Sequence, residues 1–429
     1  MNESTSLAES QLSDPHYLRS VTQMGDARPV VANRDILAAS GMKLISAGMR
    51  IDSSLYERLL QHKLVPPLDE SLSTEDAVTR ASLAESAERM MQQDTRLALI
   101  QGSQLDGVTL PLVLKQLPLN PAIAFKLTVM RETKADLFQR SLYVALVSAY
   151  IGMQLQMNKN QLVDLATGAL LHDIGMLHVD PRLLEGDYKM TEAERRHLYV
   201  HTVTGGMILK AYPEYRQKVV DAVLQHHERL DGSGYPRGLK AGELGQFGRI
   251  IGIAEVVASR SATGEVGGGS KLETMLKLNQ RRYGGDLVPF LKVFYREESE
   301  VPFCSEIDKQ LAQEKMAQIA AVFSAWEKAR SGFDSSDLTC AFASERMLNL
   351  KMEIVDAGLN LDMNGEDWIG FDEDARACFD ARLLLDETLW QLHSILQEIK
   401  RRCPAVAVED PVPAAHPLSA WVREVEALL

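Results

Sequence analysis

Apolar residues recur at helical spacing through most of the chain. From Asp136 to about Phe294 the periodicity is helical almost throughout, and it is helical again after Pro302. Apolar positions three and four residues apart lie on one face of a helix. The sequence therefore predicts a mainly α protein, with a central helical bundle at 136–296 and a C-terminal helical region at 297–429.

The first part of the chain has a different pattern. Between Arg28 and Ile51, short apolar runs alternate with turn residues, which predicts hairpin strands. A helix should follow, with its N-cap at Ser53 or Ser54. We therefore expect a small α+β module at 1–70, followed by a helical connector at 71–135.

Several helix boundaries in the middle and C-terminal parts can also be predicted. Thr191 and Glu194 have the spacing of a capping box, so a helix should begin there and run to about Tyr212. Further helices are expected at about 213–229 and 249–259. The leucine-rich helix at 376–402 is expected to serve as core or as a contact with a second copy of the chain.

Composition narrows the classes of partner. The chain has 46 Lys and Arg against 59 Asp and Glu, a formal net charge of -13. Such a protein has no general attraction to nucleic-acid polymers or anionic membranes. The longest uncharged run, Ser141 to Asn158, contains glutamine and serine and predicts a buried helix rather than a membrane span. Any phosphate-bearing ligand must therefore bind at a local site.

The N-terminus and the cysteines suggest a compartment. Residues 1–14 are polar and acidic and contain no apolar stretch of the kind found in signal peptides. The cysteines lack CxxC spacing, which predicts incidental thiols rather than disulfides or a zinc site. They are Cys304, Cys340, Cys378 and Cys403. We therefore expect a cytoplasmic protein.

Histidines are concentrated in one part of the sequence. Six of the ten fall within 172–227, where random scatter would place about one. They are His172, His178, His197, His201, His226 and His227. Two adjacent groups, His172-Asp173 and His226-His227-Glu228, suit a divalent transition metal, because imidazole and carboxylate are its preferred ligands. His178 and His197 are expected to be structural histidines satisfied by backbone carbonyls.

Three motifs carry a family resemblance. They are Leu171-His172-Asp173-Ile174-Gly175, His201-Thr202-x-x-Gly205, and His226-His227-Glu228-Arg229-x-Asp231-Gly232-Ser233-Gly234-Tyr235-Pro236. Over roughly 136–294 the chain resembles the HD-GYP domain, a branch of the HD metal-dependent phosphohydrolases. The resemblance implies a helical bundle that binds iron or manganese and hydrolyses cyclic di-GMP in bacterial second-messenger signalling. It also implies that metal-activated hydroxide attacks the phosphodiester in line.

The resemblance assigns roles to individual residues. The metal ligands it implies are His172, Asp173, His201, His226, His227 and Glu255. Asp136, one helical turn before Arg140, is a further implied ligand. His172 and Asp173 would also be the catalytic pair. The residues it places at the substrate are Gly234, Tyr235, Pro236, Arg237 and Arg249. Glu228 would orient a ligand imidazole.

The sequence also departs from the family pattern. Arg140 stands where the family has a histidine, Met176 replaces a lysine, and Glu255 replaces an aspartate. The segment after Ala258 is altered and becomes glycine-rich at 264–269, which we interpret as a flexible linker. These changes leave one or two metal ions as alternatives.

Two functional hypotheses remain open. The first is a cyclic di-GMP phosphodiesterase of HD-GYP type. The second is a catalytically inactive HD-GYP module that binds a cyclic dinucleotide or regulates another protein. Under either, the N- and C-terminal regions are candidate contacts for a signalling protein, and a homodimer is a further candidate assembly.

Overall fold

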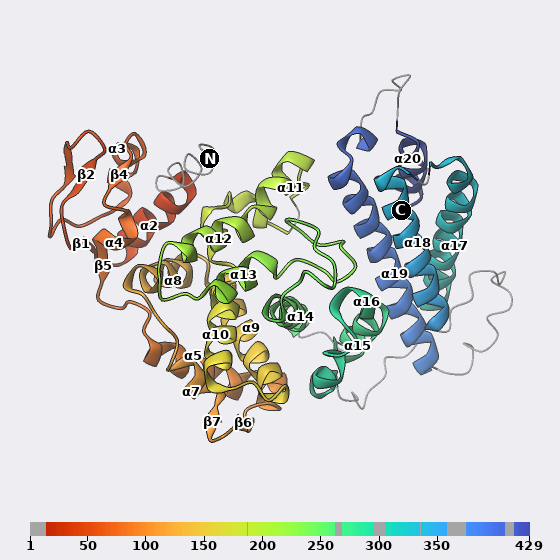
Figure 1. The fold of residues 1–429 in the computed structure, drawn as a ribbon, viewed down its shortest axis with the longest axis horizontal. Coiled ribbons are helices and arrows are strands. Elements are labelled where there is room, and N and C mark those ends of the chain that lie inside the picture. Colours follow the sequence, from red (N-terminus) through yellow and green to blue (C-terminus); the bar gives the residue numbers. More distant parts are fainter. Residues whose placement is uncertain are drawn as a thin grey trace. The chain divides into compact units, whose positions relative to one another are not determined.

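The computed structural model describes residues 14–186, 188–261, 268–295, 305–334, 336–357, 375–407 and 416–429. Helices dominate these residues, which confirms the mainly α fold (Figure 1). By contacts the chain divides into two compact units, Met1–Ala262 and Thr263–Leu429. The four-part division made from the sequence stays a prediction, and the glycine-rich linker falls largely outside the described residues.

The N-terminal module combines short strands with short helices. Strand β1 (Val30–Ala32) pairs antiparallel with β5 (Leu72–Thr74), and β2 (Ile36–Ala38) pairs with both β3 (Lys43–Ile45) and β4 (Leu64–Val65). The β2–β3 hairpin is thus confirmed. The helices of the module are α2 (Pro15–Ala27), η2 (Ser53–Leu55), α3 (Tyr56–Leu60) and α4 (Leu68–Ser71). The N-cap of η2 is Asp52 rather than a serine, because its carboxylate accepts a hydrogen bond from the Ser54 backbone N–H.

A run of short elements leads into the bundle. They are α5 (Arg80–Gln93), α6 (Thr95–Ala98), β6 (Gln104–Leu105), β7 (Val108–Thr109), α7 (Leu110–Leu114) and α8 (Pro121–Thr133). Helix α8 begins with a proline at its first position, where a missing N–H costs no intrahelical hydrogen bond.

The bundle of the first unit is built around α9 (Ala135–Gln154). Its neighbours are α10 (Lys159–Leu171) and α14 (Gln246–Ser261), and α12 (His201–Lys210) packs on α13 (Gln217–Gln225). The uncharged run that begins at Ser141 is mostly buried in α9, as expected. Among the described residues, no helix is both long and apolar enough to cross a membrane.

The helix predicted from the capping box is interrupted. Thr191 and Glu194 form the box, but α11 (Glu192–Tyr199) ends at Val200 and α12 begins at His201. The reason is side-chain competition: His201 Nδ1 binds the Leu198 carbonyl at 2.7 Å and the Thr202 hydroxyl binds the Tyr199 carbonyl at 3.2 Å. A continuous helix would pair these carbonyls with backbone N–H groups four residues on.

Two other predicted helix starts were displaced. Helix α13 begins at Gln217, after a turn at 212–215, whereas the pattern predicted a start near 213. Helix α14 begins at Gln246, three residues before the predicted start. Between α10 and α11 lie two short helices, η3 (Ile174–His178) and η4 (Pro181–Leu184).

The second unit is helical. Its elements are α15 (Gly268–Leu278), α16 (Gln280–Tyr283), η5 (Val288–Tyr295), α17 (Glu306–Ala329), η6 (Arg330–Gly332), α18 (Leu338–Asp356), α19 (Ala375–Arg402), η9 (Pro404–Ala407) and α20 (Leu418–Leu428). Helix α19 confirms the predicted leucine-rich helix and packs into the core of this unit. Cys378 is disulfide-bonded whereas Cys340 and Cys403 are free, so the expectation of four free thiols was wrong.

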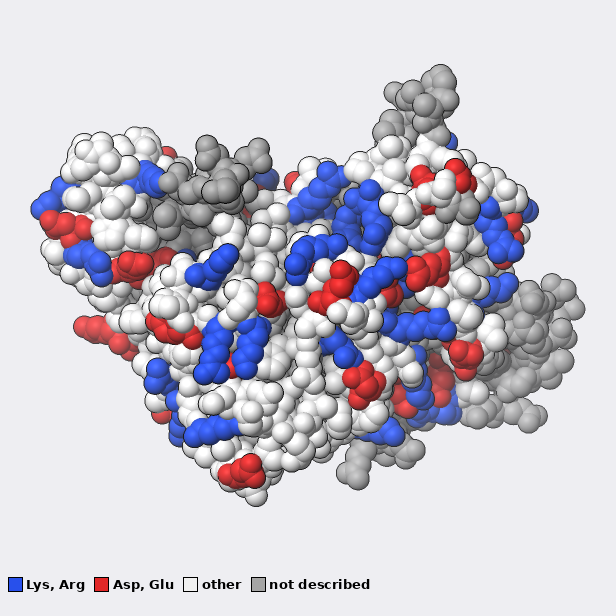
Figure 2. Space-filling model, in the orientation of Figure 1, with Lys and Arg blue, Asp and Glu red and all other residues white. Residues whose placement is uncertain are grey.

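Charged side chains of both signs occur across the visible face of each unit in Figure 2. Mixed charge of this kind agrees with the inference from composition, because binding of a nucleic-acid polymer depends on a continuous basic surface.

Candidate metal centre

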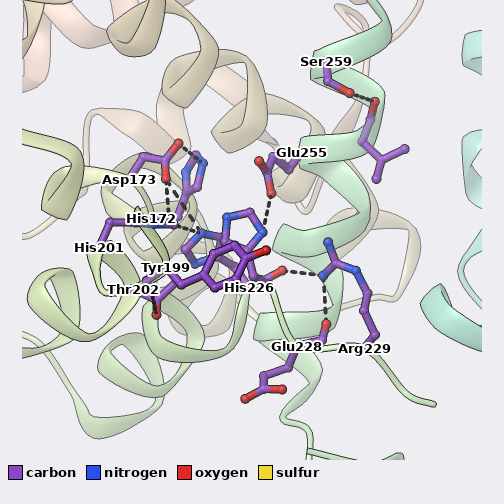
Figure 3. A network of polar contacts seen from close by, with 12 residues as sticks. His172, Asp173, Tyr199, His201, Thr202, His226, Glu228, Arg229, Glu255 and Ser259 are labelled. Carbon is purple, nitrogen blue, oxygen red and sulfur yellow. Dashed lines mark hydrogen bonds and ion pairs between the residues drawn. The ribbon is translucent and has the colours of Figure 1, made fainter. Parts of the chain in front are cut away.

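Five of the histidine and aspartate residues singled out from the sequence come together where helices of the first unit begin and end (Figure 3). His172 follows α10 and Asp173 precedes η3, while His201 opens α12 and His226 follows α13. His227 is the next residue along the chain. The ligand atoms of Asp173, His201, His226 and His227 all lie within 4.8 Å of one another.

Backbone carbonyls orient three of the imidazoles. In each case Nδ1 contacts the carbonyl oxygen three residues earlier: His172 with Ala169 at 2.8 Å, His201 with Leu198 at 2.7 Å, and His226 with Val223 at 2.7 Å. Since a carbonyl only accepts, the ring proton lies on Nδ1 in each neutral ring. Nε2 is therefore left with its lone pair, which is the atom that a metal needs.

The Nε2 atoms converge on one buried carboxylate. Asp173 lies 3.1 Å from His172 Nε2, 3.3 Å from His201 Nε2 and 3.8 Å from His226 Nε2. The Nε2 atoms of His201 and His226 are 3.4 Å apart. The side chains of Asp173 and these three histidines are at most 4% exposed.

This arrangement fits a cation. With their Nδ1 atoms on backbone carbonyls, His201 and His226 direct Nε2 at each other and at the Asp173 carboxylate, so acceptor atoms face acceptor atoms. Asp173 Oδ1 and His172 Nε2 have no hydrogen-bond partner of good geometry among the described residues. Burying such groups without a positive charge is costly, whereas a divalent metal satisfies carboxylate and imidazole together. These side chains could hold such an ion.

The electrostatics of the cluster follow from burial and mutual proximity. Burial, and then the neighbouring imidazoles, hold the pKa values of His226 and His227 well below the ordinary value. Burial alone would raise the pKa of Asp173, but His172 and the other imidazoles outweigh it and hold that pKa well below its ordinary value. Burial opposes protonation of His172, but Asp173 outweighs it and raises the His172 pKa. Near neutral pH the cluster thus presents an ionised carboxylate with at least two neutral imidazoles.

Glu255 of α14 forms a second group with His172 and Asp173, again with ligand atoms within 4.8 Å. Its carboxylate lies 3.5 Å from His227 Nδ1 and 3.4 Å from Arg140 Nη2. Arg140, on α9, is 42% exposed and Glu255 is 13% exposed. Thus the arginine that replaces the expected histidine pairs with one of the predicted metal ligands. This ion pair could not be inferred from spacing, because its partners are 115 residues apart.

Glu228 has a different role from the one predicted. It is 2% exposed, and its carboxylate accepts hydrogen bonds from the backbone N–H groups of Arg237 at 2.7 Å and Leu239 at 2.9 Å. The imidazoles are oriented by carbonyls instead, as described above. Glu228 therefore fixes the loop that follows His227, and the prediction that it orients a ligand imidazole was wrong.

That loop places Tyr235 beside the histidines. The Tyr235 ring stacks on His227 at 4.6 Å and on Tyr199 at 4.0 Å between centroids. Burial, and then the charge of Glu255, raises the Tyr235 pKa well above its ordinary value, so the phenol stays protonated. Gly234 is buried, and a Cβ there would lie 2.3 Å from Glu228 Cα, which explains the glycine. Tyr199 was missed from the sequence because a tyrosine at a helix end carries no distinguishing signal.

The glycine after His172-Asp173-Ile174 has a related explanation. A Cβ on Gly175 would lie 2.0 Å from the carbonyl oxygen of His201, closer than real contacts allow. Glycine thus lets η3 pack directly on the start of α12. The two segments that carry Asp173 and His201 are held together by this backbone contact.

The remaining predicted residues lie further from the histidines. Asp136 is exposed in the first turn of α9 and belongs to neither group of clustered ligands. Pro236 and the side chain of Arg237 are exposed. Arg249 lies on α14 six residues before Glu255, about 120° away around the helix. The roles of these residues in binding substrate or metal stay predictions.

Comparison with known proteins agrees with the resemblance in the motifs. A family model described as HD domain matches residues 119–287. A 120-residue stretch is 37% identical to a 3'3'-cGAMP-specific phosphodiesterase 1 of Vibrio cholerae, covering 28% of this chain and 27% of that protein. Another, of 113 residues, is 34% identical to a cyclic di-GMP phosphodiesterase of Thermotoga maritima, covering 26% of this chain and 31% of that protein. The chain thus spans less than a third of either relative.

Among solved structures, Bd1817, described as a HDG"Y"P protein from Bdellovibrio bacteriovorus, aligns with 62% of this chain and 95% of its own. The TM-score is 0.36 at 15% identity. Residues 119–287 thus match the HD domain family, and the motifs at His172-Asp173 and from His226 to Pro236 resemble those of its HD-GYP branch.

Proposed function

We propose that this protein is a metal-dependent phosphodiesterase that hydrolyses a cyclic dinucleotide, cyclic di-GMP or 3'3'-cGAMP. The observation that carries the proposal is the buried convergence of His201 Nε2 and His226 Nε2 on Asp173, with ring protons directed away to backbone carbonyls. The names of the similar proteins support this substrate class.

We assign the metal to Asp173, His201, His226 and His227, and we propose iron or manganese as its identity. A bound divalent ion supplies Lewis-acid polarisation of a phosphoryl oxygen and activation of water. His172, whose pKa is raised by Asp173, would stabilise the ionised Asp173 in its protonated form, through their 3.1 Å contact. Tyr235, stacked beside His227, lines the approach for a nucleotide, and Arg237 is proposed to contact its phosphates.

A second candidate function rests on the Arg140–Glu255 ion pair. A guanidinium 3.4 Å from Glu255 opposes a cation at the group formed by His172, Asp173 and Glu255. With only one ion, the two-metal clamp on attacking and leaving oxygens is lost. The alternative is therefore a module that binds a cyclic dinucleotide without cleaving it and signals to another protein.

Activity and metal content distinguish the two candidates. Full-length protein is loaded anaerobically with Fe²⁺ or Mn²⁺, its metal content is measured, and products from cyclic di-GMP and 3'3'-cGAMP are separated by chromatography. Formation of a linear dinucleotide that requires the metal, and that is lost in Asp173→Asn, supports the phosphodiesterase. Saturable binding with no product from metal-loaded protein supports the regulatory module. Absence of both product and binding contradicts both candidates.

The control is chosen to match Asp173 in residue type. Asp221 on α13 forms an exposed side-chain contact with Gln217, at 2.9 Å, and lies outside the clustered ligands. Asp221→Asn should retain metal content and product formation. Equal loss in both variants would mean that the assay reports misfolding rather than the metal site.

A further inference from the structure

The first unit contains a cavity that is separate from the histidine cluster. It has a volume of about 320 Å³ and lies among α2, α4, α8, η3 and α12. We call it the α2–α12 cavity. Its wall is largely apolar and includes Leu18, Leu64, Leu68, Met207 and Ile208. The volume is at the lower end of the range of about 300–1,000 Å³ typical of small-molecule sites.

Two polar side chains in this wall, His178 and Tyr17, have buried polar atoms without a hydrogen-bond partner among the described residues. His178, in η3, is only 8% exposed and stacks on Tyr17 with a centroid distance of 5.0 Å. Within the part of the chain that the structure describes, neither of its ring nitrogens has a hydrogen-bond partner. The expectation that a backbone carbonyl satisfies His178 was therefore wrong. An imidazole in an apolar wall has one donor and one acceptor to offer to a bound molecule.

The charges around the cavity disfavour an anion. Lys126 is 4% exposed and is already paired with Asp69 at 2.8 Å, and its ammonium lies 3.8 Å from the centre of the Tyr17 ring. Glu70 and Asp14 also line the cavity, so carboxylates outnumber the ammonium. Burial, and then the charge of Lys126, lowers the His178 pKa well below its ordinary value, so the imidazole is neutral. No cation is left unpaired in this wall for an incoming carboxylate or phosphate.

We propose that the α2–α12 cavity binds a small, uncharged, mostly apolar molecule whose hydroxyl or N–H group hydrogen-bonds to His178. The apolar wall contributes affinity by burying the body of the ligand. His178 contributes specificity, because a ligand without a polar group leaves its ring nitrogens unsatisfied.

The cavity shares two of its walls with the candidate metal centre. His178 ends η3, the short helix that begins directly after Asp173. Thr204, Met207 and Ile208 belong to α12, the helix that begins with His201. Packing of η3 on α12 through Gly175 joins these walls, so a shift in one displaces the other. Ligand binding is therefore expected to change metal affinity, an expectation that rests on the proposed function whereas the binding site itself does not.

The binding site is tested on metal-free, full-length protein with three probes of one shape: 1-naphthol, 1-naphthoate and naphthalene. The readouts are calorimetry and the ring ¹⁵N signals of labelled histidines, with His178 assigned from His178→Phe. We expect 1-naphthol to bind saturably, at least tenfold more tightly than either other probe, and to shift the His178 signal. Equal or tighter binding of naphthoate would overturn the proposal, as would saturating naphthol that leaves the His178 signal unmoved.

Variants separate the cavity from other apolar surface. His178→Phe retains the stack on Tyr17 but removes both nitrogens, and should weaken 1-naphthol at least tenfold. Ile208→Trp fills the cavity and should abolish binding. His197→Phe, an exposed histidine outside the cavity wall, is the matched control and should bind as wild type. Unchanged affinity in both cavity variants would refute the site.

Coupling to the metal centre is measured separately, as Mn²⁺ affinity with and without saturating 1-naphthol. We expect a change of at least threefold, matched by an equal change in naphthol affinity when Mn²⁺ is present. Naphthol binding without this change would overturn the coupling and leave the site intact. Protein that binds naphthol but no Mn²⁺ would instead contradict the proposed function.

Discussion

Replacing Glu228 by glutamine tests whether the loop after the histidines is held independently of them. The buried carboxylate accepts two backbone hydrogen bonds, from Arg237 at 2.7 Å and Leu239 at 2.9 Å. The amide of Glu228→Gln keeps one acceptor oxygen but turns an NH₂ group toward the other N–H. Hydrogen bonds to charged groups contribute about 1.5–3 kcal/mol. The variant loses one such bond and places two N–H donors against each other, so its free energy of unfolding should fall by about 2–4 kcal/mol.

The assay combines thermal unfolding with Mn²⁺ titration. Each kcal/mol should lower the Tm by about 2–4 °C in a domain of this size. The Mn²⁺ Kd should change less than about threefold, since His226 is oriented by the Val223 carbonyl and not by Glu228. Glu243→Gln is the matched control, because its exposed carboxylate accepts one backbone hydrogen bond, from Lys240 at 3.0 Å. That variant should be nearly neutral.

Two results would refute this reasoning. One is loss of Mn²⁺ binding in Glu228→Gln with an unchanged Tm, which would mean that Glu228 acts on the imidazoles, as the sequence suggested. The other is equal destabilisation by the Glu243 control, which would mean that burial of the carboxylate is unimportant.

Three further predictions concern other parts of the first unit. Arg140→Gln should bind more metal per chain, yet change unfolding free energy by less than about 1 kcal/mol, because Arg140 is 42% exposed; an unchanged metal content would contradict it. The folded-state pKa of His178 lies well below 6.5, so below pH 6.5 the unfolded chain binds a proton that the folded chain does not, and stability falls as pH falls. In His178→Phe the slope of unfolding free energy against pH, from denaturant titrations, should therefore be flatter there by up to about 1.4 kcal/mol per pH unit; an identical slope would refute the assignment. Gly175→Ala should cost about 1–3 kcal/mol and weaken Mn²⁺ binding as His201 is displaced, whereas Gly186→Ala, with open space around its Cβ, should do neither.

The sequence predicted the features that depend on the local spacing of residues and on recognisable motifs. The mainly α fold, the Thr191–Glu194 capping box and the convergence of four metal-ligand candidates all follow from spacing or motif. The Arg140–Glu255 pair was not predictable, because it depends on how α9 and α14 pack.

Other features of the fold and the site were not predicted, because they depend on which polar groups pair with one another. The break at Val200 arises because side chains take carbonyls that helix periodicity assigns to the backbone. Glu228 faces backbone N–H groups of a loop whose course the sequence does not encode in any periodic pattern. Likewise, His178 stands in an apolar wall built by elements from distant parts of the chain.

Burial of the imidazoles has a consequence for the proton balance of metal loading. Because the pKa values of His226 and His227 lie well below the ordinary value, both rings are already deprotonated above about pH 6.5. An incoming ion then has no proton to displace from either ring. The contribution of these two rings to the apparent metal affinity should therefore not change with pH across the neutral range. The heat measured on metal loading should contain no buffer-ionisation heat from these rings.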